Sequence, residues 1–238
     1  LCGVACWIGR KPRCTVAALL TGCAAAGLSL GAAAAERALH TSLRATLDAA
    51  FGGFLIDTVG TGGVHGPVMA RLRLVEDAAI RDGQVMLRGS VESVLVGEAV
   101  PVRGGVVVTV AGTNAAGRAS QWRAGRVVTA PMTFRRPARY LDNGVADGER
   151  ASALGGVTLL GRVKSGLLVD VVAHGSWLSE HAAQARATVR ARVRRHMSDG
   201  AASGPAIVTA LLIGDRTAIA PEIRTRLQAA GTYHVIAI

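Results

Sequence analysis

The chain of 238 residues has few aromatic side chains, only two lysines and, after residue 23, no cysteine. Because Phe, Trp and Tyr together make up 3% of the residues, the core has to be built mainly from Val, Leu, Ile and Ala. The four cysteines, Cys2, Cys6, Cys14 and Cys23, lie in or beside apolar stretches at the start, where we interpret them as small apolar residues. Their position excludes a disulfide framework or a cysteine zinc site in the rest of the chain.

The sequence contains no recognisable catalytic or metal-binding motif. Its six histidines are scattered, and none has H-E-x-x-H or comparable spacing with nearby carboxylates. The stretches "GTGG" (60–63) and "GGVVVTVAG" (104–112) lack the Lys-Ser/Thr and the helix start of a phosphate-binding loop, so we interpret them as turns. We therefore expect a protein that is not an enzyme and that uses no cofactor or metal.

Positive charge is what the chain has in excess. The formal net charge is +11 at pH 7, and nearly all of it comes from arginine, since Lys11 and Lys164 are the only lysines. This surplus predicts attraction to polyanions, either nucleic acid or anionic lipid. The alternative is a basic protein from an arginine-rich, GC-rich genome, in which the choice of arginine carries no functional meaning.

The N-terminal part has the pattern of a membrane segment. Residues 14–35 carry no charge, and at about 1.5 Å per residue a helix of that length crosses a bilayer core. The apolar "LCGVACWIG" (1–9) precedes the basic segment 10–13, which favours a transmembrane helix or helical hairpin over the alternative, a signal peptide with "GRKPR" as its basic region. The positive-inside bias then places residues 10–13 in the cytoplasm and everything after Glu36 outside it.

We expect residues 1–58 to form membrane helices and a juxtamembrane segment. Within it, residues 38–56 continue with helical spacing and are interpreted as a second helix at the membrane surface, and "GTGGVHGP" (60–67) is interpreted as a linker. From residue 68 to residue 173 the pattern changes to short strands rich in Val, Leu and Thr, separated by Gly, Asp and Asn turns. Five or six such strands without helical crossovers predict a small closed or partly open β-barrel over 66–175. The predicted strands lie within 68–76, 84–96, 105–112, 125–134, 156–165 and 167–173.

Helical periodicity returns at Ser176, a predicted N-cap, with Glu180 in the first turn. We expect a basic amphipathic helix over 176–202, which would either lie on anionic lipid or guide a DNA backbone. After Gly204-Pro205 a short apolar helix follows, and a further helix is predicted to begin at Pro221 and to end at Gly231. The amphipathic helix has an apolar stripe and an arginine stripe, formed by Leu178, Ala182, Ala185, Val189 and Val193, and by Arg186, Arg190 and Arg194.

A candidate site for single-stranded DNA lies in the strand region, where residues 68–175 hold fourteen Arg and Lys against nine Asp and Glu. Barrels that hold single strands combine a basic groove with aromatic residues on which bases stack, and arginine both bridges phosphates and stacks. Phe134 is interpreted as a core residue, whereas Trp122 and Tyr140 are either core residues or stacking residues. The alternative for this region is a scaffold or docking surface. The candidate DNA-binding residues are Trp122, Arg123, Arg126, Arg135, Arg136, Arg139, Tyr140 and Lys164.

The last stretch, "ALLIGDRTAIAPEIRTRLQAAGTYHVIAI" (210–238), resembles the opening signature of the channel domain in the ComEC competence family, bacterial inner-membrane proteins for DNA uptake. A second stretch, "RPARYLDNGVADGERASALGGVTLLGRVKS" (136–165), resembles the end of the OB-like extracytoplasmic domain in that family, with Asp-Asn-Gly at 142–144 in place of the usual Asn-Pro-Gly. The matching positions in the last stretch are Leu211, Leu212, Gly214, Asp215, Arg216, Ala230, Gly231, His234, Ala237 and Ile238.

The resemblance implies a membrane-anchored α+β protein with an N-terminal transmembrane helix or hairpin, a small OB-like β-barrel and C-terminal amphipathic and apolar helices. Residues 203–238 would be the truncated start of the polytopic channel domain, and the whole would take up single-stranded DNA during natural transformation. The implied partners are single-stranded DNA, the bilayer of the bacterial inner membrane, other competence proteins and a second copy of the chain. The alternative is a membrane-anchored OB-like scaffold or interaction module with no nucleic-acid role. Within the motif, Asp215 and Arg216 are expected to form a salt-bridged cap between two helices, and His234 either packs beside a membrane helix or contacts substrate.

Overall fold

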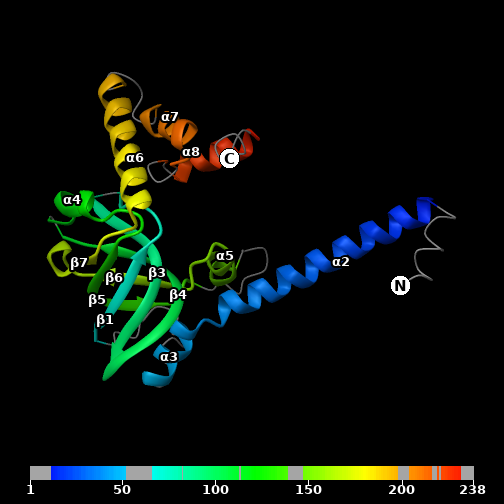
Figure 1. Ribbon diagram of the computed structural model, residues 1–238, viewed down its shortest axis with the longest axis horizontal. Helices are drawn as coiled ribbons and strands as arrows, with labels where there is room; N and C mark the ends of the chain where they lie inside the picture. The colour runs from blue at the N-terminus through cyan, green and yellow to red at the C-terminus, as the bar shows by residue number, and fades with distance from the viewer. Residues whose placement is uncertain are drawn as a thin grey trace.

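The computed structural model describes residues 12–51, 66–81, 83–112, 114–138, 147–197, 204–215, 219 and 221–231. These residues form a mixed α+β structure in which a long N-terminal helix leads away from a curled sheet, and a second long helix rises from another part of that sheet (Figure 1). The membrane hairpin partner predicted over residues 1–9 lies outside the described residues.

The sheet closes in a ring. Its strands run in the order β1-β3-β4-β6-β5, and β5 also pairs with β1, so that these five strands form a closed circuit. Strand β2 adds to β3, and β7 adds to β5. All pairs are antiparallel except β4 with β6, which are parallel. The strands are β1 (Val68–Leu74), β2 (Ala79–Arg81), β3 (Gln84–Val96), β4 (Glu98–Val110), β5 (Val127–Arg135), β6 (Leu159–Val163) and β7 (Asp170–Ala173).

Each of the six predicted regions contains a strand, and five of these strands, β1, β3, β4, β5 and β6, show the alternating burial of a half-buried strand. The strand predicted over 167–173 is confirmed only in its second half, as β7, because a 3-10 helix occupies residues 166–168. Strand β4 begins earlier than predicted, at Glu98, since it pairs with the whole length of β3. Gly105 of β4 allows the parallel pairing with β6 to start. A Cβ at Gly105 would lie 1.8 Å from the carbonyl oxygen of Gly156, and this close approach lets the Thr158 amide donate to the Gly105 carbonyl at 2.7 Å.

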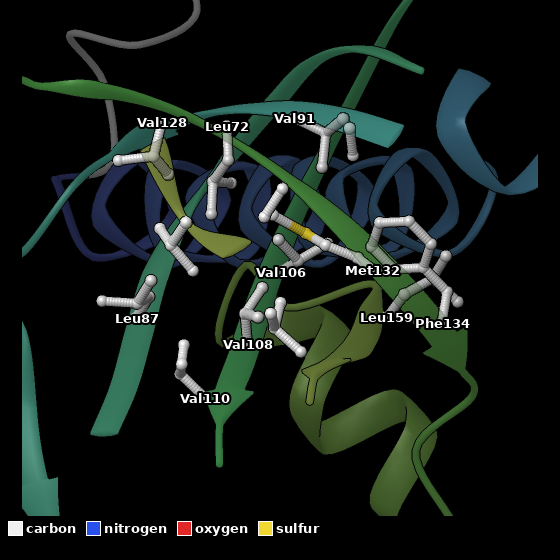
Figure 2. Packing of buried hydrophobic residues seen from close by; sticks show 14 of the residues in the cluster. Leu72, Leu87, Val91, Val106, Val108, Val110, Val128, Met132, Phe134 and Leu159 are labelled. Atoms are coloured by element: carbon white, nitrogen blue, oxygen red, sulfur yellow. The ribbon is translucent and has the colours of Figure 1, made fainter. Parts of the chain in front are cut away.

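The core fills the inside of the ring with aliphatic side chains, as the scarcity of aromatic residues predicts. Figure 2 shows Leu72, Leu87, Val106 and Met132 pointing toward one another between the strands. Trp122 is fully buried at the end of the same core, after the short helices α4 (Asn114–Arg118) and η1 (Ala119–Gln121). A second short 3-10 helix, η2 (Gly166–Leu168), leads into β7.

The N-terminal helix α2 (Pro12–Leu39) is long and apolar enough to cross a membrane, and a signal sequence near an N-terminus passes the same test. The next helix, α3 (Ser42–Ala50), does not present its apolar side to a membrane surface as expected. Leu43 and Leu47 are fully buried and belong to the core of the sheet. The reason is Gly104 in β4: any Cβ there would lie 2.8 Å from the Cβ of Leu43, so its absence makes room for the helix.

Three further helices follow the sheet: α6 (Trp177–His196), α7 (Gly204–Ile213) and α8 (Pro221–Ala229). The predicted cap of α6 is confirmed, because the Ser176 hydroxyl accepts a hydrogen bond from the Ser179 amide. The start of α8 at Pro221 and the left-handed turn at Gly231 are also as predicted.

The orientation of α6 differs from the expectation for a helix lying on lipid. Two arginines of its arginine stripe, Arg186 and Arg190, face the rest of the protein and bind Asp77, while the third, Arg194, is exposed. The apolar stripe is exposed at its start, where Leu178 is 70% exposed, and is buried only at Val193. The reason for this orientation is that the Asp77 side chain, 7% exposed, needs the two guanidiniums as partners, since a buried carboxylate left unpaired is strongly destabilising. A short helix between β5 and β6, α5 (Gly148–Leu154), packs beside α2.

Candidate functional site

Two adjoining hollows border the C-terminal half of α6. The first has a volume of about 630 Å³ and lies against the outer side of β2, β3 and β4. The second has a volume of about 550 Å³ and lies between η1, α6 and α7. Both have Asp77, Ala79, Arg190 and Asp215 in their walls, so one charged group of residues separates the two spaces.

This group, the Asp77 cluster, consists of Asp77, Arg186, Arg190 and Asp215. Arg186 donates to both oxygens of Asp77, through Nε to Oδ2 at 3.0 Å and through Nη2 to Oδ1 at 3.1 Å. Arg190 Nη2 donates to the same Oδ2 at 2.8 Å, and the Ala124 amide donates to Oδ1 at 2.9 Å. The Asp77 carboxylate, 7% exposed, therefore accepts four hydrogen bonds.

The electrostatics of Asp77 follow from these contacts. Burial alone would raise its pKa, but the hydrogen bonds from Arg186, Ala124 and Arg190, together with the charge of Arg186, hold the pKa below its ordinary value of 3.8. Asp77 in turn raises the pKa of Arg186, so both partners stay ionised. Arg186 uses two of its five N–H donors in this contact, and the charge of Asp77 offsets the attraction of its guanidinium for a phosphate.

Arg190 extends the cluster to the end of α7, because its Nε donates to Asp215 Oδ2. The carboxylate of Asp215 is buried, and Gly214 before it adopts a positive φ of 67°. Asp215 forms its salt bridge with Arg190 of α6, whereas the cap predicted for Asp215 with Arg216 stays a prediction because Arg216 lies outside the described residues.

The first turn of α6 is fixed by a separate pair. Arg126, which precedes β5, donates through Nε to Glu180 Oε1 at 2.7 Å and through Nη2 to Oε2 at 2.8 Å. The hydrogen bonds from Arg126 lower the pKa of Glu180 to about 2. Arg126 was predicted to contact DNA. In the structure its Nε and Nη2 bind Glu180, and its Nη1 donates to the Gln121 carbonyl.

Several exposed cations have no described ion-pair partner, among them Arg103 on β4 and Arg192, Arg194 and Arg195 on α6, and one group of them lies on the outer face of the pair β5–β6. Thr133 is opposite Arg162 and Arg135 is opposite Leu160, so Arg135 and Arg162 are diagonal neighbours on one face. Lys164 follows directly after the end of β6 and is also exposed. All three side chains are exposed, and within the described part of the chain no carboxylate forms an ion pair with them. We call Arg135, Arg162 and Lys164 the basic patch.

The structure separates the other predicted DNA-binding residues from this patch. Trp122 lies in the core and has no exposed surface on which a base could stack. Arg123 donates to the side chain of Gln184 at 2.9 Å, and Arg136 donates to Asp48 at 3.4 Å. Arg139, Tyr140 and His234 lie outside the described residues.

Arg162 was missed by sequence reasoning, although a signal for it exists. In "LLGRVK" (159–164) charged and apolar residues alternate, which predicts that Arg162 and Lys164 lie on the same outer face of a strand. Trp177, 70% exposed at the start of α6, was also missed; its ring centroid lies 4.5 Å from that of His181.

Among the described residues, no group of three or more His, Cys, Asp or Glu side chains is arranged to hold a metal ion. No protein-family model, no curated protein and no solved structure matches the chain.

Proposed function

We propose that this chain is the membrane-anchored, extracytoplasmic part of a bacterial inner-membrane channel that takes up single-stranded DNA, with the basic patch receiving the strand. The observation that carries the proposal is the placement of Arg135 and Arg162 on one outer face of the sheet, with exposed Lys164 just beyond β6 and no ion pair to any of the three from a carboxylate of the described residues. The resemblance of residues 136–165 and 210–238 to the ComEC family supports it. In this proposal the ring of five strands is an OB-like barrel, a class that binds oligonucleotides on its outer surface.

The basic patch suits a phosphate backbone better than the first hollow does. In that hollow, Arg88, Arg186 and Arg190 are already paired with carboxylates, so a phosphate bound there would also meet the negative charges of those partners. In the patch, Arg135 and Arg162 form no ion pair with any carboxylate of the described residues, and each offers the planar fork that binds phosphate oxygens.

In the proposed arrangement, α2 crosses the inner membrane and residues after about 36 lie outside the cytoplasm. Residues from 203 onward would begin the translocation domain. The bond between Arg190 and Asp215 supports this order, since it would fix the start of that domain to the DNA-receiving domain. The channel would act together with other competence proteins, and pairing with a second copy of the chain is compatible with it.

The test is a titration of labelled single- and double-stranded oligonucleotides with the full chain in lipid nanodiscs, followed by fluorescence anisotropy at several salt concentrations. The variant carries Arg135→Ala, Arg162→Ala and Lys164→Ala. If each side chain neutralises one phosphate, the slope of log K against log salt falls by about 2, and the affinity at about 0.1 M salt falls by about 100-fold.

A matched control removes the same charge from another exposed surface, through Arg71→Ala, Arg73→Ala and Arg103→Ala. Arg71 and Arg73 pair with Glu92 on β3, at 3.2 and 2.7 Å, so their loss changes net charge but not the patch. We expect the control to bind within about threefold of the unmodified chain, because distant exposed charges are screened by salt. Equal weakening in both variants would show that only net charge matters.

The alternative is an anchored scaffold with no nucleic-acid role. The observation that favours it is that Trp122 is buried and that Arg126, Arg186 and Arg190 are used inside the protein. If the unmodified chain binds neither oligonucleotide at low salt, the scaffold is the better explanation.

A further inference from the structure

The folded domain contacts the N-terminal helix α2 near the end of the apolar stretch of that helix. Val16 and residues 19–32 of α2 are exposed, and Ala33 is the first described position with a partly covered side chain. The uncharged stretch ends at Ala35, and Glu36 and Arg37 follow. The domain therefore starts to contact α2 within the last turn of the apolar stretch (Figure 1).

Helix α5 is the element that packs against this end of α2. It is held there by α3, because Arg44 Nη1 donates to Glu149 Oε1 at 2.8 Å and to the Leu39 carbonyl at 3.2 Å. Asp147 caps α5 by accepting from the amides of Glu149 and Arg150. Since Leu43 anchors α3 in the core, α5 has a fixed position relative to α2.

The outer side of α5 has the composition of a surface that contacts lipid headgroups. Glu149 and Ala153 are buried, whereas Arg150, Ala151 and Leu154 are exposed, Leu154 by 63%. Arg150 and Leu154 are four residues apart and so share one side of the helix. Within the described residues, no carboxylate forms an ion pair with the Arg150 side chain.

We propose that Arg150, Ala151 and Leu154 of α5 rest in the headgroup layer of an anionic bilayer. The inference depends on the proposed function to the extent that α2 spans the membrane. If it does, the contact with the last apolar turn of α2 places α5 at headgroup depth, where the guanidinium meets lipid phosphates and Leu154 reaches the boundary of the acyl chains. The domain is then supported by the membrane at two points, the span and α5.

The test measures depth at three single cysteines in the full chain. Each form carries the dye NBD at one position, with the remaining cysteines replaced by Ser: the native Cys23, Leu154→Cys and Leu167→Cys. Cys23 reports insertion of α2, and Leu167 is a matched control, because it is 60% exposed on η2, away from α2. The chain is reconstituted in vesicles of three parts phosphatidylcholine to one part phosphatidylglycerol. Quenching is then measured with nitroxide lipids labelled at the headgroup or deep in the acyl chain.

We expect acyl-chain nitroxide to quench the Cys23 label, headgroup nitroxide to quench about half of the fluorescence at position 154, and neither to quench position 167, since the headgroup layer is only about 5–10 Å deep. Adding Arg150→Glu should remove most of the quenching at position 154 while leaving Cys23 quenched.

Two negative results have different meanings. If Cys23 itself is not quenched, α2 does not span the bilayer and the proposed function fails with it. If Cys23 is quenched but position 154 is no more quenched than position 167, or is insensitive to Arg150→Glu, the headgroup contact of α5 is refuted while the membrane anchor stands.

Discussion

Asp77 is the residue whose replacement tests most directly how α6 is held. In Asp77→Asn, the side-chain amide keeps the shape of the carboxylate but loses its charge. One of its two oxygens is replaced by an NH2 group that faces the N–H groups of Arg186 or Arg190. If the amide oxygen takes the place of Oδ2, it still accepts from both guanidiniums, but the NH2 group then faces Arg186 Nη2 and the Ala124 amide. In the other orientation the NH2 group faces Arg186 Nε and Arg190 Nη2, and Arg190 keeps only Asp215 as a described carboxylate partner.

The expected loss follows from burial. Breaking a buried ion pair costs about 3–5 kcal/mol. The side chains of Arg186 and Arg190 stay 29% and 24% exposed and are partly solvated, so we expect the lower end, about 3 kcal/mol. Because 1.4 kcal/mol is a factor of ten, opening of the C-terminal half of α6 should become about 150-fold more frequent. The first turn of α6 should change little, since Arg126 and Glu180 still hold it.

Hydrogen exchange measured by mass spectrometry checks this, because it reads the opening of each helix segment separately. The matched control is Glu92→Gln, which also removes a carboxylate shared by two arginines, Arg71 and Arg73, but on an exposed surface where about 1 kcal/mol or less is at stake. Faster exchange confined to the C-terminal half of α6 and α7 in Asp77→Asn is the expected result. If both variants exchange alike, the Asp77 cluster does not fasten the helix and the reasoning is refuted.

Three further predictions concern acid stability and packing. The pKa of Glu180 in the folded chain is about 2, below its ordinary value of 4.5, so the stabilisation by Arg126 is complete above pH 4.5 and is lost as the pH falls toward 2. Calorimetry should therefore show a smaller fall in Tm between pH 4.5 and pH 2 for Glu180→Gln than for the unmodified chain. Gly105→Ala should lower the free energy of unfolding by about 3 kcal/mol, because the new Cβ meets a backbone oxygen. Gly117→Ala has open space around it in α4 and should be neutral or stabilising by up to about 1 kcal/mol, and urea titration measures the free energy of unfolding of both variants. Leu43→Ala should cost about 2–5 kcal/mol, seen as a lower urea midpoint, and a loss below 1 kcal/mol would mean that α3 is not part of the core.

The elements that the sequence predicts well are those with a local cause. Alternating Val and Leu residues specify the strands, Ser176 specifies the start of α6, and Pro221 specifies the start of α8. Strand β2 was missed because three residues between two turns are too few to show an alternation. Closure of the sheet between β1 and β5 was expected only in general terms, because the register of two strands separated by more than fifty residues is not a local property.

The site was harder to predict because the meaning of an arginine depends on what lies opposite it. Arg186 is separated by 109 residues from Asp77, its partner, and nothing in the spacing of the arginine stripe points to that carboxylate. The same composition that predicted a basic surface therefore contained paired arginines, such as Arg126, and unpaired ones, such as Arg135. Trp122 was ambiguous for a related reason, since an aromatic residue beside arginines suits both a core and a binding surface.

The folded domain is fastened at both ends by ion pairs that involve buried or half-buried carboxylates. Toward α2, Arg44 binds Glu149 and Arg136 binds Asp48; toward α7, Arg190 joins Asp77 to Asp215. Salt screens exposed charges much more than buried pairs, so these attachments should persist at salt concentrations that release DNA from exposed cations. If DNA affinity falls with rising salt while hydrogen exchange in α6 stays unchanged, the loss of affinity is due to phosphate contacts alone. If exchange in α6 rises together with the loss of DNA, the salt dependence would reflect loosening of the domain, and the basic patch would lose its main support.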